Sequence, residues 1–188
     1  ATRRGFTLVE VIVTMLILAA LAAVTYPTIK ARLTDGYENS LINELDNLAS
    51  AVMSYRENVG HYPRRLDYLT SLQTGSTDIC GNTLSAAESS GYRGPYITRN
   101  LLNTTTFYIF GNKDTISDTL RRVTGALVGT TGDYLAIVVR GPDTTSAIDI
   151  DLKVDGVKDS SNGAIRWTQG TDSLHSLRFA IPIKSGAC

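Results

Sequence analysis

The feature that most constrains this chain is an apolar run near its start, Val11 to Tyr26, which follows the segment Arg3-Arg4-Gly5-Phe6-Thr7-Leu8-Val9-Glu10. Between Phe6 and Ile29 the only charged side chain is Glu10, and Lys30 ends the run. A helix of about 20 apolar residues can cross the hydrocarbon core of a bilayer, and arginines before it mark a cytoplasmic flank. The run therefore predicts a helix that needs lipid or other apolar helices around it.

Glu10 is the unusual residue of this run, because a carboxylate inside a membrane helix is costly and usually marks function. If the chain is cut after Gly5, the new α-amino group of Phe6 lies four residues from Glu10, on the same helix face. An amine and a carboxylate so placed neutralise each other in a low-dielectric setting. If residues 1–5 are retained, we expect Arg3 or Arg4 to neutralise Glu10 instead.

The segment Arg4-Gly5-Phe6-Thr7-Leu8-Val9-Glu10, followed by an apolar helix and Pro27, closely resembles the N-terminal segment of type IV pilins and type II secretion pseudopilins. The resemblance implies that a prepilin peptidase cuts after Gly5 and that the amine of Phe6 is methylated. It also implies that Glu10 guides each subunit, through an inner-membrane assembly platform, into a helical filament whose core is built from the apolar helices. In packed filaments of this family the helix is often unwound before the proline, so we expect unwinding between Leu18 and Pro27.

Two other interpretations fit part of the same segment. A charged start, an apolar centre and the small residues of Ala20-Leu21-Ala22-Ala23 are also typical of a secretory signal peptide, although Glu10 interrupts the apolar region. A simple membrane anchor explains the apolar character but gives Glu10 no role.

Composition limits the rest of the chain to one domain attached to a long helix, because 188 residues do not make two full domains. A net charge of +0, with 19% charged and 43% hydrophobic residues, argues against a strongly basic nucleic-acid binder, although a local basic patch can still hold DNA. The arginine pairs Arg64-Arg65 and Arg121-Arg122 give weak support for such a patch. We expect a leader at 1–5, an apolar helix at 6–27, an amphipathic helix at 28–59, a connecting αβ-loop at 60–104 and a sheet region at 105–188.

A helical period continues beyond the apolar run. Steps of three and four residues predict a packed face, with a polar face that includes Arg32, Glu38 and Asp46 opposite to it. Gly60 suits the position after the last helical residue, so one helix is expected from Phe6 to Val59, bent or loosened near Ala23 by Pro27. The packed face consists of Ile29, Leu33, Tyr37, Leu41, Leu45, Leu48, Val52, Tyr55 and Val59.

A period of two begins at Thr105 and predicts strands. Together with the helix, these strands predict an α+β fold in which one long helix packs on a four- or five-stranded antiparallel meander. Shorter helical pieces are expected at 65–72 and 85–90. The expected strands are 105–110, 133–140, 147–154, 164–168 and 177–183.

The connecting loop contains two fragments, Gly60-His61-Tyr62-Pro63 and Gly91-Tyr92-Arg93-Gly94-Pro95-Tyr96, that resemble those of major pseudopilins and related pilins. Their Gly, Pro and Tyr content favours a compact, rigid surface loop over a catalytic site. His61 has no second histidine or cysteine at metal-ligand spacing, so we interpret it as a packed or solvated loop residue.

Two further sites follow from residue types. In an exported domain the two cysteines, Cys80 and Cys188, predict one disulfide, with two unpaired thiols as the alternative. Oxygen atoms of Asp155, Asp159 and Asn162 offer a candidate calcium site of the kind that major pseudopilins often use, with a self-bonded hairpin loop as the alternative. We find no nucleophile–base pair and no phosphate loop, so we expect a protein that is not an enzyme.

The sequence thus predicts the major subunit of a type IV-like pilus, a homopolymer that lies in the inner membrane before assembly and outside the cell afterwards. The alternatives are a periplasmic pseudopilin of a type II secretion system and a minor pilin for DNA uptake or adhesion.

Overall fold

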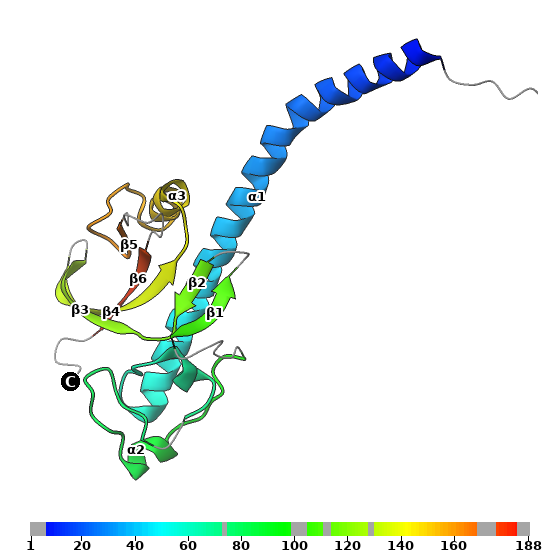
Figure 1. Ribbon diagram of the computed structural model, residues 1–188. Coiled ribbons are helices and arrows are strands. Elements are labelled where there is room, and N and C mark those ends of the chain that lie inside the picture. Colours follow the sequence, from blue (N-terminus) through cyan, green and yellow to red (C-terminus); the bar gives the residue numbers. More distant parts are fainter. Residues whose placement is uncertain are drawn as a thin grey trace, which may run out of the picture. The chain divides into compact units, whose positions relative to one another are not determined.

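The computed structural model describes residues 7–72, 75–98, 105–110, 114–127, 130–168 and 176–183. The chain divides into two compact units, residues 1–37 and 38–188. The predicted α+β architecture, a long N-terminal helix followed by an antiparallel sheet, is confirmed (Figure 1). The elements are α1 (Leu8–Val59), the 3₁₀ helix η1 (Leu66–Leu69), α2 (Ala86–Ser90), β1 (Thr106–Phe110), β2 (Asp114–Ser117), β3 (Arg121–Leu127), β4 (Thr130–Arg140), α3 (Thr144–Asp155), β5 (Ile165–Thr168) and β6 (Ser176–Pro182).

Helix α1 spans 52 residues and contains Pro27 in its interior. It ends as predicted, because Gly60 has a φ of 91° and its amide donates to the carbonyl of Arg56 at 2.8 Å. The helix is continuous from residue 18 to residue 27 in the single subunit. Unwinding of this segment was expected for the packed filament, so it stays a prediction.

Burial along α1 starts later than the sequence pattern indicated. Ile29 and Leu33, assigned to the packed face, are 56% and 69% exposed, whereas Leu41 and the apolar residues after it on that face are buried. Glu38, assigned to the polar face, is 0% exposed. The buried residues of α1 are Glu38, Leu41, Leu45, Leu48, Ala51, Val52, Tyr55 and Val59.

The sheet has six strands instead of the expected four or five. Its order is β1-β2-β4-β6-β5, with β3 pairing to β4 beside β2. The first part of β4 pairs with β3, up to Ala136 opposite Arg121, and its end pairs with β2, where Val139 lies opposite Ile116. Strand β6 lies between β4 and β5, so the sheet is antiparallel but is not the simple meander that we expected.

One predicted strand is wrong, because residues 147–154 form most of helix α3. The side chain of Asp143 caps this helix by accepting from the amide of Ser146 at 2.8 Å, and Gly156 ends it in the left-handed conformation at φ 75°. The buried positions of α3, Ser146, Ala147, Ile150 and Asp151, follow helical spacing. The alternation of apolar and polar residues in 147–154 is therefore coincidental. The two capping residues, Asp143 and Gly156, indicate the helix more reliably.

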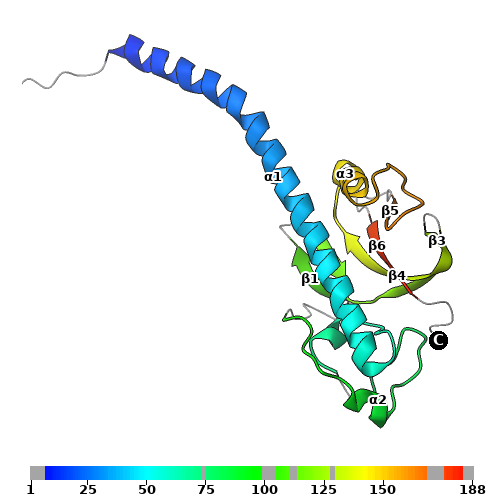
Figure 2. The same ribbon diagram turned by 180° about the vertical axis from the view of Figure 1, so that it is seen from behind.

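The core of the second unit lies between α1 and the sheet. The second half of α1 passes behind β1 and β2 in Figure 1 and in front of them in Figure 2, so it lies along one face of this part of the sheet. In β4 both sets of alternating residues are buried, from Tyr134 to Val139, because the strand is central.

Candidate functional site

The strongest candidate for a functional site is the apolar first part of α1. Among the described residues, α1 is the one helix that is long and apolar enough to cross a membrane, and no residue of its apolar window is buried. Apart from Met53, Leu152 and Val157, every exposed large hydrophobic side chain in the described part of the chain belongs to this segment. These side chains are Leu8, Val9, Val11, Ile12, Val13, Met15, Leu16, Ile17, Leu18, Leu21, Val24, Tyr26, Ile29 and Leu33.

The polar side chains within this segment are largely satisfied by the helix itself. The hydroxyl of Thr14 donates to the carbonyl of Val11 at 2.9 Å, and the hydroxyl of Thr25 donates to the carbonyl of Leu21 at 3.0 Å. Such bonds within one helix make hydroxyls tolerable where no water is present. From Leu8 to Ile29 the segment is thus suited to an apolar environment at every residue except Glu10.

Glu10 lies exposed in the first turn of α1, where a carboxylate interacts favourably with the helix dipole. This turn begins at Thr7, whose side-chain hydroxyl accepts from the amide of Glu10 at 3.3 Å. The predicted partner amine belongs to Phe6, which lies outside the described residues together with Gly5 and the two arginines. The Phe6–Glu10 pair and the cleavage after Gly5 therefore stay predictions.

The two tyrosine-containing loop fragments pack against the end of α1. The rings of Tyr92 and Tyr96 lie edge-on to Tyr55, with centroids 6.2 and 6.0 Å from it, and the guanidinium of Arg56 lies 5.1 Å from the ring centre of Tyr62. Burial raises the pKa of the Tyr55 hydroxyl. These contacts pack the connecting loop against the helix, and the rigidity of the loop stays a prediction.

His61 is held by two carboxylates. Its Nε2 lies 2.7 Å from Oε1 of Glu88, and its Nδ1 lies 3.5 Å from Oδ2 of Asp78. Glu88 also forms a capping box with Ser85 at the start of α2, and hydrogen bonds from Ser85 and His61 lower the pKa of Glu88 to about 2. The histidine therefore links α2 to the loop around Asp78.

The candidate calcium residues line a loop that is closed by its own hydrogen bonds. The carboxylate of Asp155 accepts from the amides of Ala164 at 3.0 Å and Ile165 at 2.8 Å. The carboxylate of Asp159 accepts from the amide of Ser161 at 2.9 Å and from the side chain of Asn162 at 2.8 Å. The described residues contain no group of three or more acidic, histidine or cysteine side chains arranged to hold a metal ion. Calcium at Asp155, Asp159 and Asn162 thus stays a prediction.

The predicted disulfide has one partner that the structure describes. Cys80 follows Asp78, whose carboxylate accepts from the amide of Cys80 at 2.9 Å and anchors this part of the loop. Cys188 lies outside the described residues, so the Cys80–Cys188 bridge stays a prediction.

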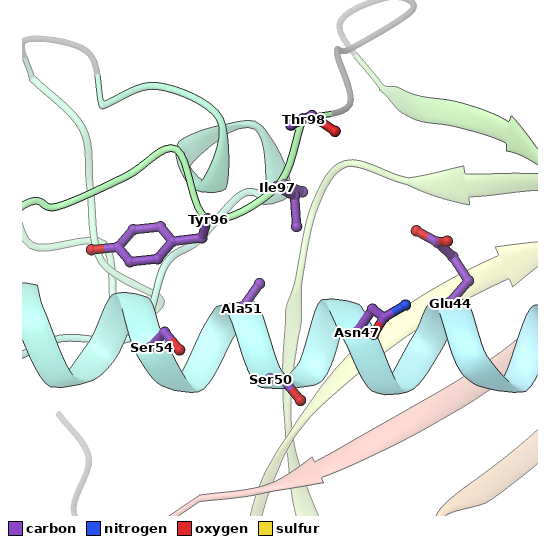
Figure 3. Close-up of a pocket in the computed structure, with 8 residues that line it drawn as sticks. All are labelled: Glu44, Asn47, Ser50, Ala51, Ser54, Tyr96, Ile97 and Thr98. Atoms are coloured by element: carbon purple, nitrogen blue, oxygen red, sulfur yellow. The ribbon is translucent and has the colours of Figure 1, made fainter.

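A pocket of about 400 Å³ lies beside α1, between this helix and residues 96–98 (Figure 3). Small and polar side chains form its helical wall, and Tyr96 and Ile97 stand above it. The wall offers hydroxyl, amide and carboxylate groups. The lining residues are Glu44, Asn47, Ser50, Ala51, Ser54, Tyr96, Ile97 and Thr98.

Sequence reasoning missed two charged arrangements, Glu38 with Lys153 and Arg166 opposite Arg178. Both depend on residues far apart in the chain or on strand register. The alternating pattern of the last two strands could have placed Arg166 and Arg178 on one face, but it could not have placed them opposite each other.

A long, exposed apolar helix that continues into an α+β domain is a pilin-like architecture. Residues 1–26 match the family described as prokaryotic N-terminal methylation motif, which is the prepilin-type signal of type IV pilins and pseudopilins. Neither the curated proteins nor the solved structures give a match to the chain. The motif supports membership of the pilin and pseudopilin family, a structural and not an enzymatic family, and implies cleavage by a prepilin peptidase and assembly.

Proposed function

We propose that this protein is the major structural subunit of a type IV-like pilus. The single observation that carries the proposal is the exposed apolar segment of α1, in which Glu10 is the one charged residue before Lys30. Moving its 14 large exposed hydrophobic side chains out of water gains on the order of 20 kcal/mol, at about 1.5 kcal/mol for each side chain. The segment therefore stays in lipid until other subunits replace the lipid around it.

Assembly would bring the apolar helices together as the filament core and leave the second unit, residues 38–188, on the outside. In that core Glu10 needs a cation, and the amine of Phe6, freed by cleavage after Gly5 and then methylated, supplies it. Intact-mass measurement of the subunit from the cell tests this step. The expected mass lacks residues 1–5 and includes one added methyl group.

The direct test of the role of Glu10 is the substitution Glu10→Ala. We expect normal membrane insertion but a large loss of incorporation into filaments, because the subunit no longer has the charge that pairs with a neighbouring amine. Glu57→Ala, at an exposed position on the second half of α1, is the matched control and should assemble normally. Normal incorporation of Glu10→Ala would remove this residue from the mechanism.

Two alternative functions share the same segment. A type II secretion pseudopilin is favoured by the two tyrosine-containing loop fragments, and a minor pilin for DNA uptake or adhesion by the paired arginines. Electron micrographs of purified filaments distinguish a major subunit, which forms abundant homopolymers, from both alternatives. Gene deletion then separates those two, because one predicts loss of protein secretion and the other loss of transformation or attachment.

Calcium binding in the loop of residues 155–163 is a separate proposal. If Asp155, Asp159 and Asn162 bind calcium, adding the ion in place of a chelator raises the unfolding temperature, and Asp159→Asn removes that rise. If the loop is held only by its own hydrogen bonds, the unfolding temperature is the same with calcium and with chelator.

A further inference from the structure

A second pocket, of about 330 Å³, lies at the end of the sheet where β5 and β6 pair, and it is distinct from the apolar helix. Its volume is at the lower end of the range of about 300–1,000 Å³ for ligand sites, which suits a ligand of monosaccharide size. Arg166 and Arg178 line it together with Tyr134 and Trp167. The remaining lining residues are Val123, Ser160, Ser161 and Thr168.

The two arginines occupy directly opposed positions on neighbouring antiparallel strands, so their side chains leave the same face of the sheet. The next pair on this face is Thr168 opposite Ser176, whose hydroxyl oxygens are 2.7 Å apart. Like charges at directly opposed positions destabilise a sheet unless something compensates them. Here the four side chains form a group of two guanidiniums and two hydroxyls.

Arg166 is held in place by the protein. Its Nη1 donates to the hydroxyl of Tyr134 at 2.6 Å, its Nε donates to the carbonyl of Gly163 at 3.3 Å, and its guanidinium carbon lies 4.6 Å from the centre of the Tyr134 ring. A guanidinium fixed in this way loses little side-chain entropy when it binds an anion.

The side chain of Arg178 forms no hydrogen bond or ion pair within the part of the chain that the structure describes. The acidic group that interacts with Arg166 is Asp159, whose pKa is lowered mainly by its hydrogen bond with Asn162 and, to a smaller extent, by Arg166. That carboxylate is already engaged with Ser161 and Asn162. The pocket therefore contains a positive charge that the neighbouring side chains leave uncompensated.

The guanidinium and hydroxyl groups of this site indicate which class of ligand it can bind. Two guanidiniums and a pair of hydroxyls match a phosphate monoester, which has three accepting oxygens and a charge of about −1.5 to −2 at neutral pH. Nucleic acid fits less well, because its binding requires a basic track along many phosphates, and the chain has a net charge of +0. The volume of the pocket leaves room for a sugar ring attached to the phosphate.

We propose that the pocket between β5 and β6 binds the phosphoryl group of a phosphorylated sugar, with Arg166 as the fixed donor and Arg178 as the donor that closes on the ligand. This role goes beyond subunit assembly, and its test does not depend on whether filaments form. A pilus or pseudopilus subunit with such a site would contact phosphorylated glycans through its outer domain.

Trp167 supplies the measurement, because it lines the pocket and is the one tryptophan of the sequence. The full chain in neutral detergent is titrated with glucose 6-phosphate at pH 7 and constant ionic strength, and the fluorescence of Trp167 is followed. Inorganic phosphate, glucose and a single-stranded oligonucleotide are titrated in parallel. We expect saturable binding of glucose 6-phosphate, weaker binding of inorganic phosphate, and no response to glucose.

Substitutions of Arg178 test whether the ligand binds at this pocket. Arg178→Gln should weaken the binding of glucose 6-phosphate by about tenfold or more, and Arg178→Lys should give an intermediate affinity because it keeps the charge but loses the planar fork. Arg93→Gln, an equal change of charge at an exposed loop position, should leave the affinity unchanged. Unaltered binding in Arg178→Gln and Arg178→Lys would overturn the proposal. Equal affinity for glucose 6-phosphate and inorganic phosphate would also overturn it. A fluorescence response to the oligonucleotide alone would do the same.

Discussion

Lys153 Nζ lies 2.6 Å from Oε2 of Glu38 and joins the end of α3 to α1, across 115 positions of sequence. The Glu38 side chain is 1% exposed, whereas that of Lys153 is 30% exposed. The other carboxylate oxygen of Glu38 is buried without a hydrogen-bond partner in the described part of the chain. A carboxylate in this position depends on its cation, because removing the cation leaves a buried charge.

The first prediction concerns this pair. Lys153→Ala should lower the free energy of unfolding by about 2 kcal/mol, less than for a fully buried pair because the ammonium is partly solvated. Lys158→Ala, at an exposed position in the following loop, is the matched control and should change stability little. Guanidinium unfolding of the full chain in detergent, followed by Trp167 fluorescence, measures both. Restoration of stability by the double variant Glu38→Gln/Lys153→Met would confirm that the unpaired charge is the cause.

The second prediction is a pH dependence at Asp114. Burial, with the nearby charge of Asp143 as a second cause, raises the pKa of Asp114 to about 6. The folded state thus holds the proton more tightly than the unfolded chain does, so the contribution of this group to stability falls as pH rises from about 4 through 6. A rise of about 2 units corresponds to about 2–3 kcal/mol.

Asp114→Asn removes the titration, so its stability relative to the unchanged protein should increase between pH 4 and pH 7. Asp46→Asn, at an exposed position on α1, should give a difference that is constant over this range. Thermal unfolding at pH 4, 5, 6 and 7 measures both differences. A constant difference for Asp114→Asn would show that this carboxyl group is not perturbed.

The third prediction uses two glycines with opposite conformations. Gly156 ends α3 at φ 75°, so Gly156→Ala should destabilise the protein by about 1 kcal/mol even though space for a methyl group is available. Gly36 lies inside α1 with nothing within 4 Å of an added methyl group, and Gly36→Ala should stabilise the helix by about 0.5–1 kcal/mol. Unfolding midpoints that shift in the same direction would contradict this account of the two positions.

The fourth prediction concerns the hydroxyl groups of two tyrosines, Tyr55, which is buried, and Tyr96, which is partly exposed. The Tyr55 hydroxyl has no hydrogen-bond partner in the described chain, so Tyr55→Phe should raise stability by about 1 kcal/mol. The Tyr96 hydroxyl accepts from the side chain of Asn58 at 3.0 Å and from the amide of Arg93 at 3.1 Å, so Tyr96→Phe should lower stability by about 1 kcal/mol or more. Calorimetry of the two variants measures both signs. A loss of stability in Tyr55→Phe would mean that its hydroxyl is satisfied.

The long helix, the loop cluster and four strands could be predicted because each carries a local periodicity or turn signal. Residues 147–154 could not be assigned by period, since a period of two and a helix agree there at several positions. The caps Asp143 and Gly156 decide the outcome, because they fix the start and the end of helix α3. Strands β2 and β3 were missed because Asp114–Ser117 is short and Arg121–Leu127 contains two arginines and a glycine, which resemble a loop.

For the candidate functional residues, too, some could be predicted from the sequence and others could not. The apolar segment and Glu10 could be predicted from the sequence because the pattern that identifies them consists of consecutive residues. Burial of Glu38 could not be predicted, because its partner Lys153 is brought to it only by the fold. The pocket at Arg166 and Arg178 depends on strand register, which a single sequence does not specify.

The most direct test of the central claim, that the apolar helix assembles with copies of itself, is an electron cryomicroscopy reconstruction of filaments purified from the cell surface or, for a pseudopilus, from overexpressing cells. The account predicts a core built from residues 6–27 of successive subunits, with Glu10 beside the amine of a Phe6 and residues 38–188 on the outside. A filament whose core excludes this helix, or a protein recovered only as single water-soluble particles, would contradict it.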